Sequence, residues 1–139
     1  MTQSAVGLID RCELNGAAAS TEDLRVLATT NYGHFTAMQV EPGGVRGLDL
    51  HLARLDDSTR ELFGQPLDGA LVREYMRSAL GGFDGAASMR VNVFSRKLHR
   101  DRMAEPAPPD VVVSVGAPRR IETTPVRLKS FRYERVLPH

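Results

Sequence analysis

Apolar residues recur at helical spacing along two stretches in the middle of the chain. In residues 48–63 they fall three or four positions apart, at Leu48, Leu52, Leu55 and then Leu62 or Phe63, which is the spacing of one buried helix face. In residues 69–80 the apolar face comprises Leu71, Val72, Tyr75, Met76 and Leu80. Glycines follow both stretches, Gly64 after the first and Gly81-Gly82 after the second, and glycine commonly ends a helix. The sequence therefore predicts two successive amphipathic helices.

Alternation of side chains between two faces, the pattern of half-buried strands, precedes and follows these helices. Residues 34–40 place Phe35, Ala37 and Gln39 on one side and His34, Thr36, Met38 and Val40 on the other. Pro42-Gly43-Gly44 then suits a tight turn. Further strands are predicted at residues 8–15, 45–46, 88–94, 110–115 and 125–133, whereas the apolar residues 24–27 do not indicate an element type.

In chain order these elements are strands, then two helices, then strands again. We expect an α+β fold, in which two helices pack on one face of a mostly antiparallel sheet. A chain of 139 residues has the length of one domain. We therefore interpret residues 1–139 as a single domain.

Composition narrows the classes of function. Of the 18 lysines and arginines, only Lys97 and Lys129 are lysines, and the arginines are scattered among acids instead of forming the basic block of a nucleic-acid-binding surface. No apolar run approaches the length of a membrane span, about 20 residues. The single cysteine, Cys12, excludes a disulfide within the chain and suits a reducing compartment. We expect a cytoplasmic protein without nucleic-acid or membrane partners.

The first predicted helix carries a candidate anion-binding pair. His51 and Arg54 lie three positions apart, on a face beside the apolar one, and side chains at this spacing can reach a common anion. A guanidinium fixed on a helix suits a phosphate because its planar set of donors matches the oxygens. The alternative is that Arg54 is an ordinary solvated surface arginine.

The histidines do not form a metal-binding set. His34, His51 and His99 lack paired ligand spacing, and no cysteine or acid cluster completes them, so we expect no metal site. The sequence also lacks the local signatures of a hydrolase nucleophile and of a glycine-rich phosphate loop.

Several short motifs stand in a characteristic order: Leu14-Asn15-Gly16, Tyr32-Gly33-His34-Phe35-Thr36, Gly43-Gly44, His51-Leu52-Ala53-Arg54-Leu55 and Ser88-Met89-Arg90-Val91-Asn92-Val93-Phe94. This order resembles the small N-terminal domain of class IV aminotransferases. These are the fold-type IV pyridoxal-phosphate enzymes, which include branched-chain and D-amino acid aminotransferases and aminodeoxychorismate lyase. The resemblance spans nearly the whole chain and rests on order and spacing, because each motif is short.

The resemblance implies a role for four residues. Arg54 would contact the phosphate of pyridoxal 5'-phosphate, and Phe35 would line the substrate pocket, the alternative for Phe35 being a core aromatic residue. Gln39 sits where relatives often carry an arginine that faces the substrate, and a neutral amide cannot clamp a carboxylate in the same way. Arg90 would help to bind a substrate carboxylate, the alternative being an ordinary ion pair. Two departures from the family pattern, Thr36 for the usual glutamate and Tyr32 near the usual aspartate, leave the substrate open.

Pyridoxal-phosphate chemistry also needs a lysine that links to the cofactor and moves a proton at the substrate α-carbon. Lys97 falls in a charged, proline-rich connection, residues 96–109. Lys129 precedes Ser130, as does the family's catalytic lysine. However, Lys129 lies inside a predicted strand, and it follows Arg54 at a shorter distance along the chain than the family's spacing implies. The resemblance therefore implies a catalytic lysine just past His139, with Lys129 as the fallback.

The expected protein is the N-terminal half of a larger two-domain enzyme. It would be a pyridoxal-phosphate-dependent aminotransferase that moves an amino group between an amino acid and a 2-oxo acid, and it would form a homodimer. The chain alone would lack the lysine and would be inactive. An activity like that of aminodeoxychorismate lyase is the alternative within the family, and a non-catalytic α+β interaction module is the alternative outside it.

Overall fold

The computed structural model of the chain describes residues 9–83, 85–120 and 123–133. Within these residues the chain forms three α-helices, six strands and one short 3-10 helix. In chain order they are β1 (Ile9–Leu14), β2 (Ala17–Ala18), α1 (Thr21–Thr30), β3 (His34–Glu41), β4 (Gly44–Val45), α2 (Leu48–Phe63), α3 (Gly69–Leu80), β5 (Ala87–Phe94), the 3-10 helix (Arg100–Arg102) and β6 (Asp110–Gly116).

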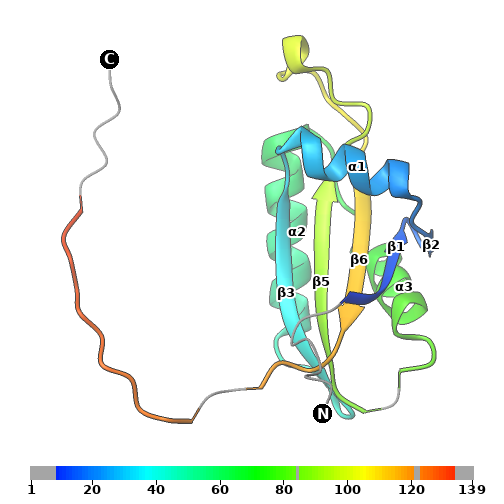
Figure 1. Ribbon diagram of the computed structural model, residues 1–139. Coiled ribbons are helices and arrows are strands. Elements are labelled where there is room, and N and C mark those ends of the chain that lie inside the picture. Colours follow the sequence, from blue (N-terminus) through cyan, green and yellow to red (C-terminus); the bar gives the residue numbers. More distant parts are fainter. Residues whose placement is uncertain (1–8, 84, 121–122, 134–139) are drawn as a thin grey trace.

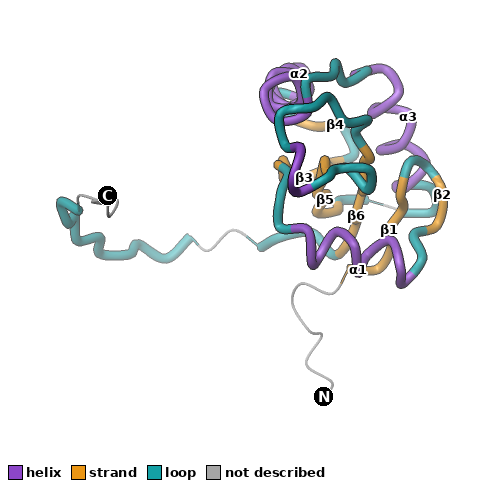
Figure 2. Tube along the Cα trace, turned by 90° about the horizontal axis from the view of Figure 1, so that it is seen from above, coloured by secondary structure: helices purple, strands orange, loops and turns teal. Residues whose placement is uncertain are grey.

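The strands form one sheet with helices on both faces. Its order is β2-β1-β6-β5-β3-β4, and all neighbouring strands run antiparallel. Helices α2 and α3 cover one face of the sheet, and α1 crosses the other face (Figures 1 and 2). The predicted α+β fold with an antiparallel sheet and two helices on one face is therefore confirmed, with α1 as an addition.

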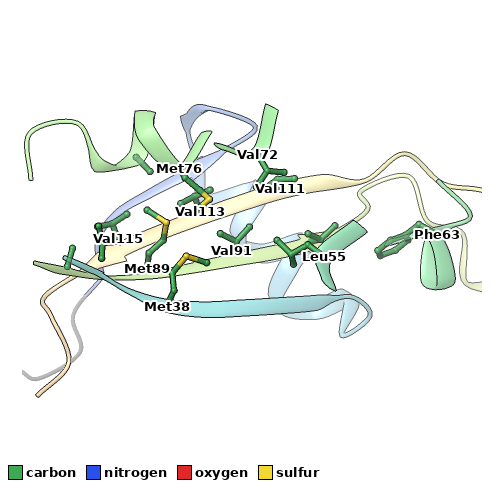
Figure 3. Packing of buried hydrophobic residues seen from close by; sticks show 14 of the residues in the cluster. Met38, Leu55, Phe63, Val72, Met76, Met89, Val91, Val111, Val113 and Val115 are labelled. Atoms are coloured by element: carbon green, nitrogen blue, oxygen red, sulfur yellow. The ribbon is translucent and has the colours of Figure 1, made fainter. Parts of the chain in front are cut away.

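The main hydrophobic core lies between the sheet and the pair α2 and α3 (Figure 3). The helices contribute Leu55, Phe63, Val72, Met76 and Ala79, and the sheet contributes Met38, Met89, Val91, Val93, Val113 and Val115. A smaller cluster on the opposite face, made of Leu14, Phe94 and Val112, packs against Val26 and Leu27 of α1. Burial on both faces of β5 and β6 fixes the register of the strands, because a shift by one residue would exchange the two faces.

The two long helices occupy the predicted ranges, and the Asn15-Gly16 turn has the positive φ values, 50° and 83°, that suit a tight hairpin. Leu71 alone departs from the predicted core face of α3, since it is 41% exposed. Helix α1 was not predicted, because it buries none of its residues fully and so shows no strong apolar stripe. Its signal is the reciprocal capping box of Ser20 and Asp23 at its N-terminus.

The predicted strand at residues 125–133 is wrong. Residues 123–133 form neither helix nor strand, and their side chains are exposed; Figure 1 shows them extending away from the sheet and helices. A strand needs a partner for its main-chain groups, and no other part of the described chain pairs with this segment. Its large apolar side chains, Val126, Leu128, Phe131 and Tyr133, are therefore 73–91% exposed.

A buried carboxylate joins the start of β6 to two distant parts of the fold. Asp110 accepts hydrogen bonds from the Arg96 main-chain N–H at 2.8 Å, from Arg96 Nη2 at 3.0 Å and from Asn15 Nδ2 at 3.0 Å. Arg96 also pairs with Asp23 of α1 at 3.0 Å. Burial by itself would raise the pKa of Asp110, but the hydrogen bonds from Arg96 and Asn15 outweigh burial and hold the pKa below its usual value.

The lowered pKa of Asp110 makes a prediction about stability and pH. Because the pKa is lower in the folded state, ionised Asp110 stabilises the fold above the ordinary carboxyl pKa of about 3.9, and this contribution is lost as the pH falls through the lowered value. We expect Asp110→Asn to reduce the free energy of unfolding at neutral pH by about 1–3 kcal/mol. The difference from the wild type should shrink as the pH falls below that lowered pKa.

Urea denaturation at neutral and at acidic pH, followed by circular dichroism, measures this effect. The control is Asp57→Asn, which neutralises an exposed carboxylate on α2 and should change the free energy of unfolding by less than about 0.5 kcal/mol. Equal pH dependence in the wild type and in Asp110→Asn would contradict the assignment.

Helices that could cross a membrane are absent from the described residues, since none there is both long and apolar enough.

Candidate functional site

Three consecutive residues of β3 are hydrogen-bonded to α2. His34 Nε2 lies 3.0 Å from Thr59 Oγ1, the Phe35 carbonyl accepts from Arg54 Nη2 at 3.1 Å, and Thr36 Oγ1 lies 2.6 Å from His51 Nδ1. The side chains at 34 and 36 face α2 because alternate residues of a strand share a face. Residue 35 takes part through its main chain. These bonds hold the segment of α2 that carries Arg54 against β3.

His34 is neutral in this arrangement. The Thr59 hydroxyl donates to the Leu55 carbonyl at 2.7 Å, so its proton is committed and we infer that His34 Nε2–H is the donor to Thr59. His34 Nδ1 is then an acceptor, buried without a hydrogen-bond partner among the described residues. Burial, with a smaller contribution from the Arg54 guanidinium, lowers the pKa of His34. The positive charge at this place on the surface is therefore that of Arg54.

Arg54 has the geometry expected of a phosphate ligand. Its side chain is exposed on α2, and the hydrogen bond to the Phe35 carbonyl fixes one end of the guanidinium. The group carries several further N–H donors in one plane, and that bond leaves most of them for an anion. With only Nη2 engaged, this guanidinium keeps donors on its other two nitrogens, an arrangement that suits a phosphate group.

Phe35 and Arg90 lie together on the outer face of the sheet, opposite α2 and α3. Phe35 is 47% exposed, so it is not part of the core. The Arg90 guanidinium stacks on its ring, with the central carbon 3.7 Å from the ring centroid, which is a favourable cation–π geometry. Among the described residues no carboxylate lies within ion-pair distance of Arg90. The structure thus brings two of the predicted substrate-binding residues into contact.

Gln39 lies on the same face, but its amide is engaged with the main chain. Its Oε1 accepts from the Arg119 N–H at 3.0 Å, and its Nε2 donates to the Arg119 carbonyl at 3.5 Å. The segment that follows β6 is therefore fixed beside β3. Sequence reasoning did not find this contact, because the two residues are 80 positions apart and Arg119 lies in no regular element.

A cavity of about 290 Å³ adjoins Phe35. It lies between the C-terminal end of α1 and the strands β3 and β5, and its lining includes Leu27, Ala28, Asn31, Phe35 and Asn92. Asn92 is directly opposite Phe35 in the pairing of β3 and β5. Because side chains alternate along residues 88–94, Asn92 lies on the same face as Arg90, and the sequence could have predicted its place in the cavity. The position of Asn31 could not be predicted in this way, because it depends on the unpredicted α1.

The described lysines do not approach Arg54. Lys129 lies in the exposed segment 123–133, with its Nζ 5.0 Å from the centroid of the Phe131 ring. Lys97 is exposed after β5, near Asp110 and Pro108. In the part of the chain that the structure describes, no lysine therefore lies beside Arg54 or the pair Phe35 and Arg90. It also holds no group of three or more His, Cys, Asp or Glu residues that could bind a metal ion.

Comparison with known proteins identifies relatives of this fold. Residues 33–138 match the sequence model of the amino-transferase class IV family, whereas no curated protein matches significantly. The 4-amino-4-deoxychorismate lyase of Pseudomonas aeruginosa is similar in structure, with 30% identity and a TM-score of 0.56 over 78% of this chain and 40% of the lyase.

Two branched-chain aminotransferases show the same fold at lower identity. The enzyme of Thermoproteus uzoniensis, solved with norvaline, has 16% identity and a TM-score of 0.59 over 77% of this chain and 40% of its own. The T.th. enzyme, solved with pyridoxamine 5'-phosphate, has 15% identity and a TM-score of 0.59 over 79% of this chain and 41% of its own. This chain thus spans about two fifths of each of these structures. With the family match covering most of its residues, the chain belongs to the class IV aminotransferase family.

Proposed function

We propose that this chain is the small domain of a pyridoxal-phosphate-dependent aminotransferase, which moves an amino group between an amino acid and a 2-oxo acid. The observation that carries the proposal is the Arg54 guanidinium, held at one nitrogen by the Phe35 carbonyl at 3.1 Å and open to an anion elsewhere. The family match and the ligand of the T.th. relative support pyridoxal 5'-phosphate as the cofactor.

The described residues would bind the cofactor at one end of the site and the substrate at the other. Arg54 would hold the cofactor phosphate, and Phe35 and Arg90 would bind the substrate, Arg90 through a carboxylate. When bound, pyridoxal phosphate withdraws electrons from the substrate α-carbon and so makes its proton removable. Phe35 connects the two ends, since its carbonyl holds Arg54 and its ring lies under Arg90.

The rest of the enzyme would come from further residues of the same polypeptide and from a second copy. Because the chain spans about two fifths of its structural relatives, we place the lysine that holds the cofactor in the remainder, with Lys129 as the fallback. The exposed apolar residues of segment 123–133 would be covered there. We propose a homodimer as the active form and expect the 139 residues alone to be inactive.

A lyase acting on aminodeoxychorismate is the second candidate. The 30% identity with the Pseudomonas aeruginosa lyase favours it, since the branched-chain aminotransferases are about half as similar in sequence. Product analysis separates the two reactions: an aminotransferase needs a 2-oxo acid as amino acceptor, whereas a lyase turns over its substrate without one.

The test of cofactor binding is spectroscopic. The full-length polypeptide that carries this sequence should absorb near the edge of the visible range when purified with pyridoxal phosphate, and borohydride should fix the cofactor covalently to one lysine. Mass spectrometry of a digest then identifies that lysine, which we expect beyond residue 139. A colourless protein that takes up no cofactor would overturn the proposal and favour a non-catalytic interaction module.

A further inference from the structure

The hydrogen bond between Thr36 and His51 is a polar contact beside the main hydrophobic core. Thr36 is 1% exposed, and its hydroxyl lies 2.6 Å from Nδ1 of His51. The next side chains on the same face of β3, Met38 and Val40, belong to the core. An apolar side chain of similar shape would also fill the space at position 36, so packing alone does not account for the hydroxyl.

The direction of this hydrogen bond follows from burial. A buried hydroxyl that donates to nothing costs free energy, and among the described residues the hydroxyl of Thr36 has no other partner than His51. Thr36 therefore donates to Nδ1 of His51, which then carries no proton of its own. His51 is only half-buried, so without the hydroxyl its ring would be free to turn toward water.

The same turn of α2 carries Arg54. His51 and Arg54 lie three positions apart on the helix, so their side chains are neighbours. Their partners, the Thr36 hydroxyl and the Phe35 carbonyl, belong to consecutive residues of β3. If α2 shifted along β3, Arg54 could exchange this carbonyl for a neighbouring one, whereas His51 depends on the side chain of Thr36. Of the two bonds, the one between Thr36 and His51 therefore selects the register of α2 on β3.

We propose that Thr36 and His51 are positioning residues, which set the place at which Arg54 presents its guanidinium to the cofactor phosphate. This inference rests on the proposed function, in which Arg54 binds that phosphate. Thr36 and His51 act through Arg54 and do not themselves contact the cofactor. Their removal should therefore weaken the binding of a ligand with a phosphate and spare one that lacks it.

The test compares pyridoxal phosphate with pyridoxal, which has the same ring and aldehyde but no phosphate. Absorbance titration of the full-length polypeptide, freed of cofactor, gives the affinity for each. We expect Thr36→Val to weaken pyridoxal phosphate binding by about 3- to 10-fold, as for the loss of one hydrogen bond. The affinity for pyridoxal should change by less than about 2-fold. Thr36→Ser keeps the hydroxyl and should restore the preference for the phosphorylated ligand.

Two further variants make the test specific. His51→Leu should reduce the preference for pyridoxal phosphate as Thr36→Val does, and the double variant should lose no more than the larger single loss, because both changes remove the same bond. Thr30→Val is the matched control. It deletes a hydroxyl that donates within α1, to the Val26 carbonyl at 2.7 Å, and should leave both affinities unchanged.

Equal losses for both ligands in Thr36→Val would overturn the inference, since they would indicate a general effect on folding. An unchanged preference for pyridoxal phosphate would overturn it as well. If Thr36→Val shows no cooperative unfolding in urea, His51→Leu decides the question, because it changes the half-buried end of the bond. Failure of the proposed function has a different signature: the wild type would take up neither pyridoxal phosphate nor pyridoxal.

Discussion

Replacing Arg54 with alanine is expected to weaken the binding of pyridoxal phosphate to the full-length protein by about 10- to 100-fold. On the proposed function, the phosphate would lose the charge-assisted bonds that the guanidinium, fixed by the Phe35 carbonyl at 3.1 Å, would donate to it. The side chain is exposed and loses only one hydrogen bond to the protein, so the free energy of unfolding should fall by no more than about 1 kcal/mol. An absorbance titration gives the affinity, and urea denaturation gives the stability.

Two comparison variants show whether cofactor affinity depends on the planar donor set of Arg54. Arg60→Ala removes an exposed arginine from the same helix, one that pairs with Asp56 at 3.0 Å, and should leave cofactor affinity unchanged. Arg54→Lys keeps the charge but loses the planar donor set, and its affinity should lie between those of the wild type and Arg54→Ala. If Arg54→Ala and Arg60→Ala bind the cofactor equally well, Arg54 is not the phosphate ligand.

Phe63→Ala should destabilise the fold more than Asp110→Asn does, by about 3–5 kcal/mol in the free energy of unfolding. Phe63 is 1% exposed at the end of α2. Its ring meets Tyr32 edge-on at a centroid distance of 5.7 Å and lies 6.3 Å from the ring of His34. Alanine would leave a cavity where α2 meets the start of β3, and the surrounding side chains relax only partly into such a space.

Urea denaturation of the wild type and the variant measures the effect. Leu50→Ala is the control, because Leu50 lies on the same helix but is 77% exposed, and it should change the free energy of unfolding by less than about 0.5 kcal/mol. A loss in Phe63→Ala no greater than that in Leu50→Ala would contradict the packing described for this end of α2.

The parts of the fold that sequence predicts well are those whose pattern repeats locally. Helix α2 begins at Leu48 and ends at Phe63, as the spacing of its apolar residues predicts, because all its buried positions lie on one face. Helix α1 offers no such repetition, since it buries no residue fully. The alternation in segment 123–133 resembles a strand, but alternation does not say whether a partner strand is present.

The candidate site also contains features that local patterns predict and features that they do not. Placing Phe35 and Arg90 on the outer face required only the alternation within β3 and β5 together with their pairing. The contact of Gln39 with Arg119 joins a strand to an irregular segment 80 positions away, and periodicity carries no information about such a pair. His51 was predicted to share an anion with Arg54, whereas its hydrogen-bond partner in the structure is the Thr36 hydroxyl at 2.6 Å, a contact that depends on how α2 packs on β3.

The hydrogen bond from Arg54 to residue 35 ends on a main-chain oxygen, which every amino acid possesses. On the proposed function, mutation at position 35 would therefore change the surface offered to a substrate and leave the anchoring of the cofactor intact. Cofactor binding and substrate selectivity would then be independent of each other at this position of β3. This independence would let one scaffold acquire new substrates through side-chain changes while its binding of a shared cofactor stays the same.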